Sequence, residues 1–177
     1  VAECVGLDIH GEAGIIKLNQ KLTKNSGSVV DEFCKARVAC SNGSTYFFGV
    51  SGGIFERESS GTWTDRGTTA PAAGAAGVLS AWEYQGYIYY AMQSRLGRIA
   101  VRSDSFATFT NTDADFHPMW EVNEVLYIGD KHYVAQVDAG TFSANALDLK
   151  TGLRIKSLGN LDTDLLIGTS VADKVMR

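Results

Sequence analysis

An eleven-residue phrase that occurs four times without an internal gap constrains the fold of this chain more than any other feature. The copies are Ala39–Gly49, Ala81–Ala91, Met119–Gly129 and Leu158–Gly168, and their first residues lie 42, 38 and 39 positions apart. Each copy has an apolar pair, a polar stretch of about five residues, and an apolar triplet closed by Gly or Ala. Two short apolar segments around a polar turn are typical of a β-hairpin. We therefore predict the same hairpin four times.

The interval between the hairpins predicts how they are arranged. A repeat of about 39 residues is close to the repeat of about 40–45 residues in the best-known propeller family, where each repeat is a four-stranded blade. Shorter apolar segments follow the hairpins at the same interval. We assign third strands to 14–22, 53–55, 97–100, 132–135 and 174–176, and fourth strands to 62–64, 108–110 and 143–149. The predicted fold is all-β, a β-propeller of four-stranded antiparallel blades.

We expect residues 1–177 to form a single β-propeller domain or a fragment of one. The expected parts are a partial blade at 1–30, complete blades at 31–74, 75–114 and 115–152, and a partial blade at 153–177. A blade cannot bury both of its faces alone, so neighbouring blades must cover it. Three arrangements close the ring: the two partial blades share one position, a longer protein contributes further blades, or chains associate as a homo-oligomer. We favour a piece of a ring with about five or more blades.

Composition excludes several classes of protein. The chain has 177 residues, a formal net charge of -4, 45% hydrophobic and 20% charged residues, which is an ordinary globular composition. A nucleic-acid-binding domain is expected to carry a basic face, so we predict no nucleic-acid partner. No apolar run approaches the roughly 18–20 residues that span a bilayer, so we predict no membrane span. Because the chain starts at Val1 rather than Met, we expect its ends to come from a longer reading frame or a processed precursor.

Motifs for catalysis and cofactors are missing from the sequence. It has no Gly-rich phosphate loop, no G-x-S-x-G nucleophile elbow and no H-E-x-x-H helix, so we predict no cofactor and no catalytic residue. Asp8, His10 and Glu12 alternate in the sequence, so in a strand all three would point to one face. No repeat supplies a further ligand, so we predict no metal site. We expect His117 and His132 on the surface or in turns.

The three cysteines do not have the spacing of a zinc site. Cys34 and Cys40 are separated by five residues, and no second Cys/His pair follows them. We expect the cysteines to behave as small buried apolar residues. A disulfide between Cys4 and Cys34, or between Cys34 and Cys40, is the alternative.

Two tryptophans occupy the same position in neighbouring repeats, and they are the candidate ligand-binding residues. Trp82 is followed by Glu83, and Trp120 is followed by Glu121; the sister positions hold Cys40-Ser41 and Gly159-Asn160. Such side chains can stack on sugar rings, or they can fill the wedge between blades on the innermost strand. We favour wedge filling, and we keep Trp82, Glu83, Trp120 and Glu121 as candidates for ligand binding.

Several blade phrases resemble propeller domains in predicted structural proteins of environmental phages. The phrases are Gly14–Lys24, Asn25–Ser28, Ser41–Phe48 and Glu83–Tyr90, and the resemblance spans about residues 7–135. It implies a non-enzymatic role in a virion or in extracellular surface interaction. Segments 57–63 and 102–109 also resemble the Asp-box of sialidase-like propellers, Ser-x-Asp-x-Gly-x-Thr-Trp. The first segment lacks the Asp and is one residue short, and the second lacks the Ser and the Gly. In that family the box stabilises a turn.

The sequence favours a non-enzymatic binding or structural module, a propeller scaffold that presents loops to a protein or glycan partner. The alternative is a glycoside-processing enzyme of the sialidase-like propeller type. That alternative requires a central pocket with paired carboxylates or with convergent arginines, for which Arg37, Arg95 and Arg98 are the candidates. A third possibility is a scaffold for protein assembly without a small-molecule site.

Overall fold

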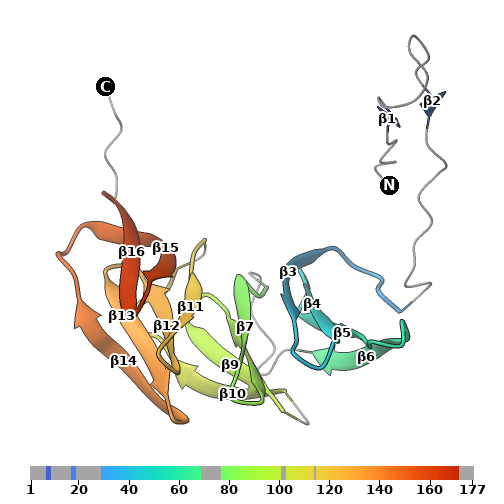
Figure 1. The fold of residues 1–177 in the computed structure, drawn as a ribbon, viewed down its shortest axis with the longest axis horizontal. Coiled ribbons are helices and arrows are strands. Elements are labelled where there is room, and N and C mark those ends of the chain that lie inside the picture. Colours follow the sequence, from blue (N-terminus) through green and yellow to red (C-terminus); the bar gives the residue numbers. More distant parts are fainter. Residues whose placement is uncertain are drawn as a thin grey trace.

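The computed structural model describes residues 7–8, 17–18, 29–68, 77–100, 103–113 and 115–171. Every regular element in these ranges is a β-strand, and the strands form antiparallel sheets (Figure 1). The strands are β1 Leu7–Asp8, β2 Lys17–Leu18, β3 Cys34–Ala39, β4 Thr45–Gly49, β5 Gly53–Arg57, β6 Trp63–Thr68, β7 Ser80–Tyr84, β8 Tyr87–Ala91, β9 Arg95–Ile99, β10 Ser103–Thr108, β11 Met119–Val122, β12 Val125–Asp130, β13 Tyr133–Asp138, β14 Thr141–Asp148, β15 Leu153–Leu161 and β16 Asp164–Val171.

Each four-stranded sheet is one blade, because its strands are hydrogen-bonded in chain order. The first blade is β3–β6, the second is β7–β10 and the third is β11–β14; β15 and β16 form the C-terminal hairpin. The predicted hairpins are confirmed, because the apolar triplets of the four repeats lie in the second strands β4, β8, β12 and β16. The all-β propeller architecture predicted from the repeat is therefore the architecture of the chain.

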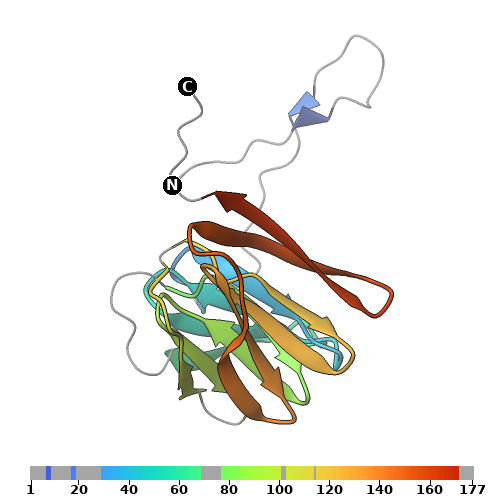
Figure 2. The same ribbon diagram turned by 90° about the vertical axis from the view of Figure 1, so that its left-hand side faces the viewer.

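The blades pack face to face around their innermost strands. β3 lies next to β7, β7 next to β11, and β11 next to β15, and Figures 1 and 2 together show the sheets stacked in chain order. Phe48 and Tyr90 belong to the core between the first and second blades. Tyr89 and Leu126 belong to the core between the second and third blades. The apolar residues of the repeat thus bury the faces that one blade cannot cover alone.

The turns of the hairpins differ in length from one blade to the next, although the repeated phrase does not. In the second and third blades, two-residue turns at Gln85-Gly86 and Asn123-Glu124 have positive φ angles, which suit the twist of antiparallel strands. In the first blade the turn runs from Cys40 to Ser44, because Ala39 pairs with Thr45. The predicted five-residue polar stretch is therefore correct for the first blade only. In the second blade the inner strand continues through Trp82 to Tyr84.

The outer strands correct one prediction. The third strands at 53–55, 97–100 and 132–135 correspond to β5, β9 and β13, and the fourth strands at 62–64 and 143–149 correspond to β6 and β14. The strand predicted at 108–110 is wrong, because β10 ends at Thr108. Phe109 is buried and stacks on His117. It therefore packs within the connection between the second and third blades and not within a strand. The strand predicted at 174–176 lies outside the described residues.

The cysteine prediction is also corrected. Cys34 is exposed at the start of β3, and Cys40 is half-buried in the turn of the first hairpin. The two do not form a disulfide with each other, and Cys4 lies outside the described residues. Burial raises the pKa of the Cys40 thiol to about 11, and the carboxylates of Glu83 and Glu56 add to this.

Candidate functional site

The innermost strands bring the four candidate ligand-binding residues together. Trp82 and Glu83 lie on β7, and Trp120 and Glu121 lie on the neighbouring strand β11. The two indole rings are in contact, with ring centroids 5.2 Å apart and planes inclined by 52°. Both tryptophans are half-buried, and Glu121 is exposed. Trp82 also packs against the core between the second and third blades, as expected for a side chain that fills the wedge.

Hydrogen bonds link this position from one blade to the next. The backbone N–H and the hydroxyl of Ser41 donate to Glu83, at 2.6 and 2.9 Å. The indole N–H of Trp82 faces Glu121 at 3.5 Å, and the indole N–H of Trp120 donates to Asn160 at 3.0 Å. Each donor therefore reaches an acceptor about one repeat further along the chain. We call the set the inner-strand stripe: Ser41, Trp82, Glu83, Trp120, Glu121 and Asn160.

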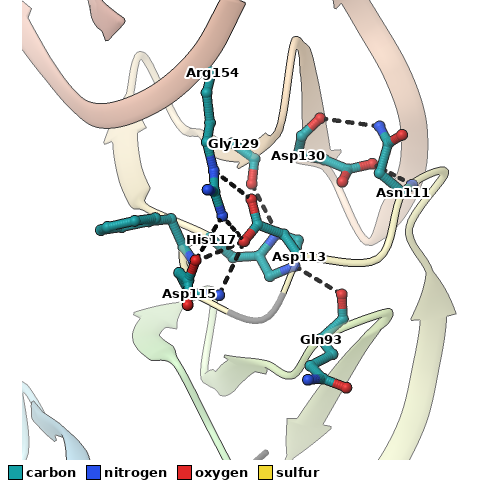
Figure 3. Close-up of polar contacts among 9 residues, drawn as sticks. Gln93, Asn111, Asp113, Asp115, His117, Gly129, Asp130 and Arg154 are labelled. Carbon is teal, nitrogen blue, oxygen red and sulfur yellow. Dashed lines mark hydrogen bonds and ion pairs between the residues drawn. The ribbon is translucent and has the colours of Figure 1, made fainter. Parts of the chain in front are cut away.

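A second polar cluster lies in the connection between the second and third blades (Figure 3). The side chain of Asp113 is fully buried and accepts hydrogen bonds from Nε of Arg154 at 3.0 Å and from Nη2 of Arg154. Its Oδ1 also accepts the backbone N–H groups of Asp115 at 2.9 Å and Phe116 at 3.2 Å. Arg154 lies on β15, so this buried ion pair ties the connection to the C-terminal hairpin.

The pKa of Asp113 reflects this environment. Burial alone would raise the pKa, but the hydrogen bonds from Arg154, Asp115 and Phe116 outweigh burial, and the pKa lies below its usual range. A carboxylate held in this way is a poor general base, because it binds a proton weakly. Arg154 also pairs with exposed Asp115 at 3.1 Å. The arrangement stabilises the junction and does not resemble a catalytic acid–base pair.

His117 is buried, which contradicts the expectation that it lies on the surface or in a turn. Its side chain is 1% exposed and stacks on Phe109 with a centroid distance of 4.2 Å. Nδ1 lies 2.8 Å from the carbonyl oxygen of Gly129, and Nε2 lies 3.1 Å from that of Gln93 (Figure 3). Carbonyls only accept hydrogen bonds, so the neutral ring satisfies one of them and the protonated ring satisfies both. The ring thereby joins the second and third blades.

Asp130 completes this polar cluster. It is fully buried, and its Oδ2 accepts the backbone N–H of Asn111 at 2.9 Å. The side-chain amide of Asn111 donates to the carbonyl oxygen of Asp130 at 3.2 Å. Burial raises the pKa of Asp130, against the lowering effect of Asn111 and of nearby His117. Its buried Oδ1 has no hydrogen-bond partner among the described residues.

The three candidate arginines lie on two different blades. Arg37 lies on β3, while Arg95 and Arg98 lie on β9. Arg98 pairs with Asp104 at 3.2 Å and lies over the ring of Phe106. No hydrogen bond, ion pair or cavity found in the described part of the chain joins the three arginines.

A tyrosine beside a carboxylate and an arginine occurs between the first and second blades. Tyr46 and Arg66 line a cavity of about 270 Å³, and Arg66 pairs with buried Glu56 at 2.5 Å. Burial, followed by a hydrogen bond with Glu56, raises the pKa of Tyr46 to about 12. An activated nucleophile requires a lowered pKa or an adjacent base that removes its proton. The shift at Tyr46 has the opposite sign, so this tyrosine is held protonated.

No metal site is found among the residues that can be described. No group of three or more His, Cys, Asp or Glu side chains there could hold an ion. Asp8 is described only for its backbone, and His10 and Glu12 lie outside the described residues. In the described ranges, no helix is long and apolar enough to cross a membrane.

The fold and the inner-strand contacts define the chain as a β-propeller. A scan against protein-family models and a search of curated protein sequences returned no match. Among solved structures, virginiamycin B lyase from Staphylococcus aureus is similar with a TM-score of 0.60 and 15% identity, over 81% of this chain and 49% of the lyase. The extracellular domain assigned to a hybrid two-component system from B. thetaiotaomicron is similar with a TM-score of 0.61 and 16% identity, over 86% of this chain and 21% of that chain.

A computationally designed protein is also similar, with a TM-score of 0.58 and 10% identity, over 87% of this chain and 99% of the designed one. This chain thus spans about half of the lyase and a smaller part of the extracellular domain, whereas it spans nearly all of the designed protein. At identities of 10–16% the likeness shows the fold alone, because one fold hosts many unrelated functions.

Proposed function

We propose that the protein is a non-enzymatic binding module in which the propeller holds a glycan against the inner-strand stripe. The observation that carries this proposal is the pair of half-buried indoles, 5.2 Å apart, beside the exposed carboxylate of Glu121. The C–H face of a sugar ring packs on an indole, and carboxylate and amide oxygens accept hydrogen bonds from its hydroxyl groups. The stripe therefore offers both kinds of contact on neighbouring rigid strands.

The titratable groups described above favour binding over chemistry. The Glu83 carboxylate already accepts two hydrogen bonds from Ser41. The pKa of Asp113 is lowered and that of Tyr46 is raised, so neither is prepared as a general base or a nucleophile. The glycoside-processing alternative has no favouring observation among the described residues. A loop-mediated contact with a protein partner remains the competing form of the binding proposal.

An extracellular or virion location is part of this proposal. One similar structure is an extracellular domain, and the blade phrases resemble predicted phage structural proteins. Both observations concern other proteins, and they are the support for this location.

The proposal predicts that Trp120→Ala weakens glycan binding by about tenfold, because stacking on an aromatic ring contributes about 0.5–1.5 kcal/mol in addition to the apolar area that the indole buries. The measurement is a glycan array followed by calorimetric titration of the best ligand. Trp63→Ala is the matched control, since Trp63 is a half-buried tryptophan on β6 that contacts Phe47 and lies outside the stripe. Equal affinities for Trp120→Ala and the wild type would contradict the proposal. An array without any ligand, together with capture of a protein, would favour the protein partner.

We also propose that a second copy of the chain covers the C-terminal hairpin and helps to complete the ring. Within the described residues β16 is hydrogen-bonded to β15 alone. Leu161, Leu166 and Val171 of this hairpin are exposed, although the corresponding faces of the other blades are covered. An uncovered edge with apolar residues favours association.

Sedimentation velocity tests this association. The wild-type chain is expected to form a dimer or a larger oligomer at micromolar concentration, and Leu166→Asp is expected to shift it toward the monomer. Leu147→Asp is the control, because Leu147 is similarly exposed but lies on the outer strand β14 of a complete blade. A wild-type chain that stays monomeric at all concentrations would exclude the second copy.

A further inference from the structure

A cavity of about 490 Å³ lies between the third blade and the C-terminal hairpin, apart from the inner-strand stripe. Its lining includes Asp113, Lys131, His132, Arg154, Lys156 and Ser170. Four of these side chains are basic, and the chain as a whole is acidic, with a net charge of -4. A cavity of this size is within the range of small-molecule sites, about 300–1,000 Å³.

Among these lining residues the carboxylate is that of Asp113, and its charge is neutralised by Arg154. Asp113 receives two hydrogen bonds from Arg154 and two from backbone N–H groups. These bonds use Nε and Nη2 of Arg154, and no hydrogen bond found in the described residues uses its Nη1. Arg154 is shared between Asp113 and exposed Asp115, so these three groups add no positive charge to the cavity, and the two lysines supply it.

The two lysines are available to a ligand. Neither Lys131 nor Lys156 forms an ion pair with a described residue. The ammonium group of Lys156 lies 3.7 Å from the centre of the Phe116 ring, which orients it without neutralising it. His132 lies 3.9 Å from Asp148, at the limit of an ion pair.

The backbone holds the Lys131–His132 turn in place. Lys131 has a φ of 55°, which a non-glycine residue adopts only at specific turn positions. The carbonyl of Lys131 accepts the N–H of Ile155 at 2.8 Å, and the carbonyl of His132 accepts the N–H of Leu149 at 2.9 Å. The turn is therefore fixed to the start of the C-terminal hairpin, and the basic groups need little ordering when a ligand binds.

We propose that this cavity binds an oxyanion, a phosphate or sulfate group that is free or carried by a small molecule. Lys131 and Lys156 supply the charge, and Nη1 of Arg154 and the Ser170 hydroxyl supply further donors. Charge-assisted hydrogen bonds of this kind are about twice as strong as neutral ones. The cavity exceeds the size of the anion alone, so it has room for the molecule that carries it.

The test is a titration of the full chain with sodium sulfate and, separately, sodium phosphate, at constant ionic strength maintained with sodium chloride. The expected result is saturable binding by calorimetry, with shifts in the backbone amide resonances of Lys131, His132 and Arg154. The double variant Lys131→Gln/Lys156→Gln is expected to bind about tenfold more weakly or worse. An organic phosphate that binds more tightly than inorganic phosphate would show that the site takes the anion as part of a larger molecule. Equal affinities would show that it takes the free ion.

The charge-matched control is Arg37→Gln/Lys150→Gln, which removes two positive charges outside the cavity lining and is expected to keep the wild-type affinity. Loss of binding in the control to the same degree would overturn the proposal in favour of a general charge effect. Absence of saturable binding to the wild type, or resonance shifts elsewhere in the chain, would also overturn it. Because the amide shifts are measured on the wild type, the outcome does not depend on whether the double variant folds.

Discussion

Replacing Asp113 by alanine is expected to lower the free energy of unfolding by about 3–5 kcal/mol, the usual cost of removing one partner of a buried ion pair. The carboxylate is fully buried, and it receives hydrogen bonds from Arg154 and from two backbone N–H groups. Its loss leaves those backbone donors without an acceptor and leaves Arg154 paired only with exposed Asp115. Urea denaturation followed by tryptophan fluorescence measures the change.

Asp115→Ala is the matched control for this ion pair. Asp115 contacts the same guanidinium, but its side chain is 62% exposed. Exposed ion pairs contribute about 0–1 kcal/mol, so we expect a change of less than about 1 kcal/mol. Equal effects of the two substitutions would show that the buried pair does not hold the junction.

The stabilising effect of the Asp113 carboxylate is expected to depend on pH. The pKa of Asp113 in the folded chain lies below its ordinary value, which is about 3.9 for an aspartate in an unfolded chain. Its contribution is therefore fully present above about pH 4 and is lost as the pH falls through the lower, folded pKa. The difference in stability between the wild type and Asp113→Asn should shrink below pH 4. A difference that stays constant into that range would contradict the assignment.

Gly97→Ala is expected to destabilise the chain by about 1–3 kcal/mol, because an added methyl group overpacks a closed interface. A Cβ atom at Gly97 would overlap the ring of Tyr90. That ring is fully buried and packs against Phe48 of the first blade, with centroids 5.6 Å apart. The hydroxyl of Tyr90 contacts that of Ser103 at 2.5 Å, so the ring has little freedom to move aside. Thermal unfolding measures the effect.

Gly159→Ala is the control for this substitution. Gly159 is also a strand glycine, on β15, and a Cβ atom there would meet no atom within 4 Å. Since Gly is less favourable than Ala within a strand, we expect this variant to be neutral or slightly more stable. A destabilisation equal to that of Gly97→Ala would indicate that the contact with Tyr90 is not the cause.

The repeated hairpin could be predicted because its residues recur at a fixed interval. Trp82 and Trp120 occupy the same position in adjacent repeats, so packing of blades face to face was enough to predict that they lie close together. In the neighbouring repeats, Ser41 and Asn160 occupy the position of Glu83 and Glu121, so the aligned repeats already contained the residues of the whole stripe. What the sequence does not contain is the ligand, since a stacked tryptophan serves packing and binding equally well.

The buried polar cluster could not be predicted from the repeat. Asp113 and Arg154 are 41 residues apart, and the connection that contains Asp113 has no counterpart in the four hairpins. His117 precedes a proline in an irregular segment, a context that favours an exposed turn. It is buried instead because two backbone carbonyls of different blades lie within hydrogen-bonding distance of its ring. Contacts of this kind depend on how the connection folds back between the blades.

The direction of the hydrogen bonds along the inner-strand stripe has a consequence for how such a chain can lengthen. Each blade donates forward to the one that follows, through Ser41, Trp82 and Trp120 in turn. A copy of the second or third blade, inserted by duplication of its coding segment, would meet an acceptor ahead of it and a donor behind it. The new interface between blades would therefore already contain a donor and an acceptor. The number of blades could change in evolution without further substitutions on the inner strands.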